Sequence, residues 1–183
     1  PATYALAEVL AAEPPSAFTG GVLDLGCGSG FLAAFLAARF GVRAASCDFN
    51  VDACRLAALN TSLAARPTSS SSAPEARPAA TRVFCADFRA FPSRAAFGLI
   101  LAGEMLYARE NHGPILAFLD RHLAARGAAW LADPGRSAAE GFAAAAAAAG
   151  YAVDLRRAPS RAAGRNVDVY RLTREIPTLA PLG

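Results

Sequence analysis

The chain has 183 residues, of which 54% are hydrophobic and 18% are charged, and its formal net charge is +3. This length and composition predict one globular domain over residues 1–183 and exclude a disordered chain. The charge is weak and forms no clustered basic stripe, which argues against a nucleic-acid partner, and no uncharged apolar run is long enough to span a membrane.

The four cysteines show no metal-ligand spacing and no Cys-x-x-Cys pair, and three of them lie in or beside apolar segments. We interpret them as reduced core residues and predict no metal site. Reduced cysteines indicate a reducing intracellular compartment, with the cytoplasm as the default. No signal peptide is visible, and a mitochondrial or plastid location stays open if a leader has been removed before Pro1.

The first 66 residues alternate between helix and strand patterns. A helix over 3–12 and a lead-in to residue 20 precede a strand over 22–25, a glycine turn and a helix over 31–40 that Gly41 stops. A second strand over 42–47 ends at Asp48, and Asn50 is placed to cap a helix that runs to Leu63. Residues 67–80 are rich in Pro, Ser and Ala, lack periodicity and predict a flexible surface insertion within the domain.

The rest of the chain continues the alternation and then departs from it. Short apolar strands are predicted over 82–86, 97–102 and 128–132, with a helix over 112–123. An Ala-rich helix over 138–149 stops at Gly150, and strands over 151–156 and 167–172 follow without a helix between them. The predicted fold class is therefore α/β: a Rossmann-like, doubly wound, seven-stranded and mostly parallel sheet with a C-terminal antiparallel hairpin.

Acidic side chains recur where these strands end. Asp48, Asp87, Glu104 and Asp133 follow strands two to five, and Asp24 lies within the first strand. Ligands of such sheets bind outside the carboxyl ends of the strands, near the point where the strand order reverses. A single acid at a strand end is common as a helix cap or a solvated loop residue, but a series of them at one edge predicts a ligand site.

The glycine turn after the first strand narrows the kind of ligand. Gly26, Gly28 and Gly30 are spaced two apart, whereas a dinucleotide fingerprint would place its third glycine at Phe31. A P-loop is excluded because the chain contains no lysine. A glycine turn that opens a helix still presents bare backbone and a helix N-terminus to a ligand.

The Asp-x-Gly-x-Gly-x-Gly pattern over residues 24–30 resembles motif I of the class I S-adenosylmethionine-dependent methyltransferases, and the likeness covers essentially the whole chain. The resemblance implies S-adenosylmethionine as the cofactor, with Asp24 near its ammonium group and Asp48 on its two ribose hydroxyls. Phe49 would lie against the adenine, whose amino group and edge Asp87 and Phe88 would hold. The cofactor-binding residues implied in this way are Asp24, Gly26, Cys27, Gly28, Gly30, Asp48, Phe49, Asp87 and Phe88.

The segment after the fourth strand indicates which kind of acceptor receives the methyl group. It lacks the Asn/Asp-Pro-Pro-Tyr motif of base methylases, and Glu104-x-x-Tyr107 resembles the D/E-x-x-Y/F signature of the seven-β-strand protein-lysine methyltransferases. Residues 131–136 (LADPGR) are similar to the electron-transfer-flavoprotein β-subunit branch of that group, and residues 166–170 (NVDVY) to the last strand of the wider group. The resemblance implies that Glu104 and Tyr107 are the catalytic residues and that the partner is a protein with a lysine acceptor.

An amine acceptor suits these two residues. Lysine has a pKa of about 10.4, so the site must orient the nitrogen and let its proton leave before the methyl is transferred. Glu104 would hold the incoming ammonium, and Tyr107 would pack beside the alkyl chain or bond the nitrogen. Three alternatives stay open: a structural role in which Glu104 caps a helix and Tyr107 is a core aromatic, a small-molecule acceptor, and a methyltransferase-like subunit that has lost catalysis.

Overall fold

The computed structural model describes residues 2–64, 81–160 and 164–174, so the predicted insertion over 67–80 lies outside the described residues. The α-helices and strands are α1 (Ala2–Ala11), β1 (Val22–Leu25), α2 (Phe31–Phe40), β2 (Ala44–Asp48), α3 (Val51–Ala64), β3 (Val83–Cys85), β4 (Phe97–Ala102), α4 (His112–His122), β5 (Leu123–Asp133), α5 (Phe142–Ala148), β6 (Tyr151–Ser160) and β7 (Arg165–Arg174). Short 3-10 helices lie between them: η1 (Pro15–Phe18), η2 (Phe88–Ala90), η3 (Arg109–Asn111) and η4 (Ser137–Ala139).

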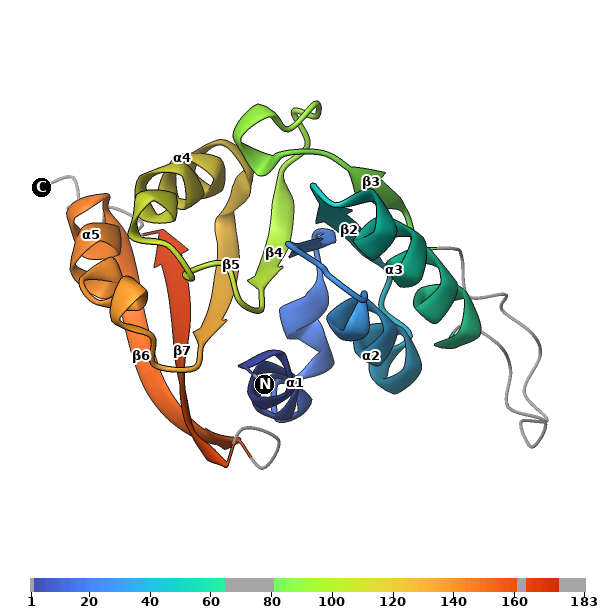
Figure 1. Cartoon of the computed structure of the whole chain (residues 1–183), viewed down its shortest axis with the longest axis horizontal. Helices are drawn as coiled ribbons and strands as arrows, with labels where there is room; N and C mark the ends of the chain where they lie inside the picture. The colour runs from blue at the N-terminus through green and yellow to red at the C-terminus, as the bar shows by residue number, and fades with distance from the viewer. Residues whose placement is uncertain (1, 65–80, 161–163, 175–183) are drawn as a thin grey trace, which may run out of the picture.

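The strands form one seven-stranded sheet in the order β3-β2-β1-β4-β5-β7-β6 (Figure 1). Strands β1 to β5 are parallel to one another, and β7 is antiparallel to both β5 and β6. This arrangement confirms the predicted α/β fold with its C-terminal antiparallel hairpin. The chain moves outwards from β1 to β3 and then returns to the other side of β1 as β4. The strand order therefore reverses between β1 and β4, which is where such sheets bind ligands.

Helices cover both faces of the sheet: α1, α2 and α3 lie on one face, and α4 and α5 lie on the other (Figure 1). Alternate side chains of β1 enter the two cores, since Val22 packs with residues of α1 and α2, whereas Leu23 and Leu25 pack with residues of α4. Burial on both faces explains why the parallel strands are continuous apolar runs. None of the described helices combines the length and the hydrophobicity that crossing a membrane requires.

Residues at the helix ends correctly predicted where the early helices begin or end. Gly41 has a φ of 65° and donates its N–H to the Ala37 carbonyl, which ends α2 as predicted. The Asn50 side-chain oxygen accepts hydrogen bonds from the amides of Asp52 and Ala53, at 2.8 and 3.1 Å, and so caps α3. The predicted N-terminal helix is confirmed as α1, one residue earlier than expected.

The second half differs from the prediction in element length. The Ala-rich segment is not one helix, because Gly141 has a φ of 81° and separates the short turn η4 from α5. Strand β5 begins at Leu123, directly after α4, instead of at residue 128. Strands β6 and β7 extend to Ser160 and Arg165, because their antiparallel pairing continues past the apolar residues into a charged segment.

Candidate active site

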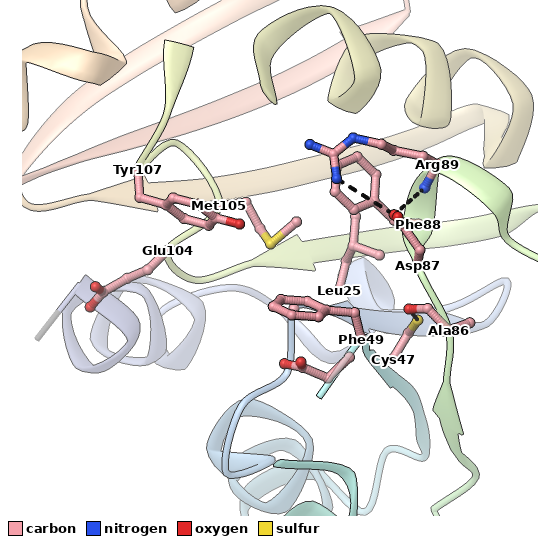
Figure 2. A pocket seen from close by; sticks show the side chains of 12 residues that line it. Leu25, Cys47, Phe49, Ala86, Asp87, Phe88, Arg89, Glu104, Met105 and Tyr107 are labelled. Carbon is pink, nitrogen blue, oxygen red and sulfur yellow. Dashed lines mark hydrogen bonds and ion pairs between the residues drawn. The ribbon is translucent and has the colours of Figure 1, made fainter. Parts of the chain in front are cut away.

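A cavity of about 290 Å³ opens at the carboxyl ends of β1, β2 and β4, at the reversal of strand order. Its walls come from β1 and β2, from η2 and from the loop after β4 (Figure 2). The lining residues are Leu25, Gly26, Cys47, Asp48, Phe49, Ala86, Asp87, Phe88, Arg89, Glu104, Met105 and Tyr107. The sequence therefore predicted the edge of the sheet at which this cavity lies.

The glycine turn is a close-packed structure that has no room for side chains at two of its positions. A Cβ on Gly30 would lie 2.8 Å from the backbone of Ala57 in α3, and a Cβ on Gly26 would collide with the Met105 sulfur. A Cβ on Gly28 would meet nothing within 4 Å. The turn thus packs against α3 and against the loop after β4, and leaves open space at Gly28.

Asp48 ties this turn to the loop after β2. One oxygen of its carboxylate accepts a hydrogen bond from the Gly28 amide at 2.9 Å, and the other accepts one from the Asn50 amide at 2.9 Å. A carboxylate has about four lone-pair sites. Asp48 therefore keeps acceptor capacity for two donors from a ligand in the cavity that it lines.

Phe49, which follows β2, and the residues of η2, which follow β3, also line the cavity. The Phe49 side chain is 70% exposed, although it is a large apolar ring, and it extends over the cavity (Figure 2). Asp87 accepts a hydrogen bond from the Arg89 amide at 2.9 Å, which caps η2. Phe88 is buried, and the Arg89 guanidinium lies 4.9 Å from the centre of its ring. An exposed ring and a carboxylate in the lining of one cavity suit a flat base that carries an amino group.

Asp24 is buried below the turn and does not line the cavity. Its carboxyl group has a pKa raised to about 7, chiefly by burial; a hydrogen bond from the Ala33 backbone opposes this shift, and the charge of Asp48 adds to it. Its Oδ2 atom has no hydrogen-bond partner among the described residues. The structure thus places Asp24 behind the glycine turn, outside the lining of the cavity.

Glu104 lines the cavity and is also held by two neighbours. Its carboxylate accepts a hydrogen bond from the Ala2 amide at 3.0 Å and pairs with the Arg136 guanidinium at 2.7 Å. Arg136 in turn pairs with Asp133, whose side chain is fully buried. Partial burial acts to raise the pKa of Glu104, but its polar contacts, with the hydrogen bond from Arg136 first among them, hold that pKa below its usual value. Glu104 is therefore ionised at neutral pH.

Tyr107 and Met105 complete the wall above Phe49 (Figure 2). The Tyr107 side chain is 51% exposed, so it is a residue of the cavity mouth and not a core aromatic. Met105 is buried, with its sulfur against Gly26. Asn111 donates a hydrogen bond to the Met105 carbonyl at 3.2 Å and accepts one from Arg89 at 2.6 Å. Buried Asn111 thus connects the loop after β4 to η2.

Of the predicted site residues, the cavity brings together Gly26, Asp48, Phe49, Asp87, Phe88, Glu104 and Tyr107. The cavity lining does not include Asp24, Cys27, Gly28 or Gly30. The last three belong to the glycine turn itself, and Asp24 lies in the strand before it. Burial raises the pKa of Cys27, followed by the charges of Asp24 and Asp48, so its thiol stays protonated. In the sequence, Arg136 stood out only as part of the LADPGR segment, and Arg89 and Met105 did not stand out. Their positions next to predicted residues were the only signal available.

Comparison with known proteins agrees with this fold. Residues 1–73 match the family described as Methyltransferase small domain. A comparison with curated protein sequences finds no match.

Several solved structures are similar over most of the chain. A TehB-like SAM-dependent methyltransferase from Corynebacterium glutamicum has 20% identity and a TM-score of 0.64, with 93% of this chain and 88% of that chain covered. The Burkholderia thailandensis 1,6-didemethyltoxoflavin-N1-methyltransferase has 19% identity and a TM-score of 0.67, with coverages of 95% and 79%. The glycopeptide N-methyltransferase MtfA has 14% identity and a TM-score of 0.68, with coverages of 95% and 94%. The chain therefore has the Rossmann-like fold found in these methyltransferases.

Proposed function

We propose that this chain is an S-adenosylmethionine-dependent methyltransferase that transfers a methyl group to a lysine side chain of a protein. The observation that carries the cofactor assignment is the cavity in which Asp48, the glycine turn and the exposed ring of Phe49 meet at the reversal of strand order. The match over residues 1–73 supports the same assignment. Two of the similar structures were solved with S-adenosylmethionine or S-adenosylhomocysteine bound, which also supports it.

The residues of the cavity fit this cofactor. Asp48 offers its remaining lone pairs to two ribose hydroxyls, and the fixed amides of Gly28 and Asn50 hold the carboxylate in place. The ring of Phe49 provides a flat apolar wall for adenine, and Asp87 has a free side-chain oxygen for its amino group, since the Arg89 contacts involve Oδ1 alone. When bound, S-adenosylmethionine supplies a methyl group on a positively charged sulfur.

The acceptor assignment rests on Glu104 and Tyr107 at the cavity mouth. Glu104 is ionised at neutral pH and half-buried, so it attracts a cationic side chain more strongly than a fully solvated carboxylate does. Tyr107 presents a half-exposed ring beside it for the alkyl chain of lysine. The nitrogen must lose a proton to expose its lone pair, and solvent at the open mouth can accept that proton. Alignment of the amine then supplies much of the rate enhancement.

A small-molecule acceptor is the second candidate. Arg136 lies 2.7 Å from the Glu104 carboxylate and neutralises part of its charge, which reduces its attraction for an ammonium group. A compound without a positive charge would then bind at the same mouth. The similar structures include enzymes whose names refer to a toxoflavin precursor and to glycopeptides.

Cofactor binding is tested by titration calorimetry with S-adenosylmethionine. We expect the wild type to bind and Asp48→Ala to lose about 10- to 100-fold in affinity, because charge-assisted hydrogen bonds to the ligand are removed. Asp52→Ala is the matched control, since this acid of the same segment is exposed and pairs with exposed Arg55 at 3.0 Å. Absence of binding by the wild type would contradict the proposed activity. Equal losses in both variants would contradict the role of Asp48.

The acceptor is tested by transfer of a tritiated methyl group into a cell lysate. We expect label in protein and its recovery as methyllysine after hydrolysis. Label found only in small molecules would contradict the lysine assignment and support the second candidate. Binding of S-adenosylmethionine without transfer to either fraction would instead favour a methyltransferase-like subunit without catalysis.

A further inference from the structure

Two cysteine side chains lie together beside the loop that carries Asp48 and Phe49. Cys54 belongs to the first turns of α3, and Cys85 is the last residue of β3, where it pairs in register with Asp48. The Cys54 thiol lies 3.4 Å from the carbonyl oxygen of Phe84, the residue before Cys85, which places it next to Cys85. Both are free thiols in the structure, and neither lines the cavity.

Both thiols also contact the backbone of that loop. The Cys54 thiol donates to the Asp48 carbonyl at 3.4 Å, and the Cys85 thiol donates to the Phe49 carbonyl at 3.6 Å. Asp48 and Phe49 are the residues that we place on the ribose and the adenine. A reaction that removes these two S–H donors therefore acts directly on the backbone of the cofactor site.

The two thiols differ in a way that suits sequential oxidation. Cys85 is exposed, whereas Cys54 is 8% exposed. Burial raises the pKa of Cys54, and the neighbouring Cys85 raises it further. Reaction with an oxidant requires a thiolate that solvent can reach, which favours Cys85 as the first group to react. Cys47 is a poor alternative because it is 1% exposed and burial raises its pKa to about 12.

We propose that Cys54 and Cys85 form a thiol pair that hydrogen peroxide oxidises to a disulfide, and that this disulfide weakens cofactor binding. The Cys85 thiolate attacks a peroxide oxygen, so that an S–O bond forms, the O–O bond breaks and water leaves after protonation. Cys54 then attacks the sulfenic sulfur of Cys85. An S–S bond forms, the S–O bond breaks, and the hydroxide leaves as water with the Cys54 proton. The dithiol loses two electrons, which the peroxide gains.

The disulfide acts on the site through the loop between β2 and α3. A bond between the sulfurs requires each thiol to turn away from its carbonyl and toward the other thiol, so both loop carbonyls lose their thiol donors. Asp48 and Phe49 shift relative to the glycine turn as a result. By thermodynamic reciprocity, bound cofactor should slow disulfide formation. This coupling rests on the proposed function, whereas the thiol pair itself does not.

The thiol pair is tested by peptide mapping. The full chain is reduced, freed of reductant, treated with hydrogen peroxide, alkylated and digested for mass spectrometry. We expect a cross-linked peptide containing Cys54 and Cys85 that disappears on addition of dithiothreitol. We expect neither Cys85→Ser nor Cys54→Ser to form it. Oxidation of the cysteines to separate sulfinic acids, or a cross-link to Cys27 or Cys47, would overturn the proposal.

The coupling is tested with two measurements on the same samples. Oxidation should weaken S-adenosylmethionine binding about tenfold in the wild type, reversibly, and leave Cys85→Ser unchanged. Amide hydrogen exchange at Gly28 and Asn50, which bond to Asp48, should also speed up on oxidation. Unchanged affinity in the cross-linked protein would overturn the coupling. If the reduced wild type binds no cofactor, the proposed function fails. The cross-link and the exchange rates still test whether Cys54 and Cys85 form a disulfide that alters the loop.

Discussion

At the scale of single residues, Asp24 shows how burial changes the chemistry of a side chain. Burial raises its pKa from 3.8 to about 7, so the folded state binds a proton more tightly than the unfolded chain does. Asp24 therefore contributes most to stability below about pH 4, and this contribution is lost as the pH rises to about 7. A shift of this size corresponds to up to about 4 kcal/mol.

Asp24→Asn removes this titration and keeps an oxygen that accepts the Ala33 hydrogen bond. We expect the variant to gain stability relative to the wild type between about pH 4 and pH 8, because only the wild type must ionise a buried acid. Urea unfolding at both pH values measures the difference. Asp52→Asn is the exposed control and should show no such trend. A difference between Asp24→Asn and the wild type that is independent of pH would contradict the prediction.

A substitution at Glu104 can separate binding of the methyl acceptor from binding of the cofactor. Glu104→Gln keeps an acceptor for the Ala2 amide but removes the charge that would hold an ammonium group. We expect methyl transfer to fall at least about tenfold through misalignment of the acceptor, with unchanged affinity for S-adenosylmethionine. Glu140→Gln is the control, because Glu140 is exposed and its pairing with Arg109 at 3.8 Å lies outside the cavity. Equal losses of transfer and of cofactor affinity would remove Glu104 from the acceptor site.

At the scale of elements, the two ends of α2 depend on glycine for different reasons. Gly30 precedes the helix with a φ of 72°, and a Cβ there would press against Ala57 of α3 at 2.8 Å. Gly41 ends the helix with a φ of 65°, and a Cβ there would meet nothing within 4 Å. The first glycine permits both a backbone conformation and a helix contact, whereas the second permits only a conformation.

Gly41→Ala should cost about 1–2 kcal/mol of unfolding free energy, the usual penalty of a left-handed residue with a Cβ. Gly30→Ala should cost a further 1–3 kcal/mol or so, because α3 must also move. Urea unfolding of both variants measures the two costs. Equal destabilisation would show that α3 accommodates the extra methyl group and would contradict the close packing seen at Gly30.

The elements that the sequence predicted best are those with local end signals. The bounds of β1, α2 and β4 agree with the prediction, because each lies next to glycines or is a continuous apolar run. The break at Gly141 was missed because the alanines around it favour helix on both sides. The extensions of β6 and β7 were missed because pairing with a neighbouring strand, and not the residues themselves, keeps their charged ends extended.

At the scale of the whole molecule, contacts between distant segments complete the site, and the sequence could not reveal them. The Glu104 carboxylate meets the Ala2 amide across 102 positions and Arg136 across 32. The acids at the strand ends were predictable because the carboxyl ends of parallel strands share one edge. The groups that neutralise Glu104 depend instead on how α1 and the loop after β5 pack in three dimensions.

The first helix also covers the last strands. Leu6 and Leu10 of α1 are fully buried in one cluster with Trp130 of β5 and with Val167 and Val169 of β7. Segments from opposite ends of the described chain therefore share one core. Such a core predicts that the N-terminal helix and the C-terminal strands unfold together.

Leu6→Ala tests this coupling. We expect a loss of about 2–5 kcal/mol, because a fully buried leucine leaves a cavity that the neighbouring residues fill only in part. Trp130 is the only tryptophan of the chain, so its fluorescence reports on β5, while circular dichroism reports on all helices and strands. Both signals should shift to the same lower urea concentration, and exposed Glu8→Ala should shift neither. If circular dichroism falls early while the Trp130 transition stays in place, α1 unfolds alone and the shared core does not couple the two ends. Affinity for S-adenosylmethionine under folding conditions should not change, since Leu6 does not line the cavity.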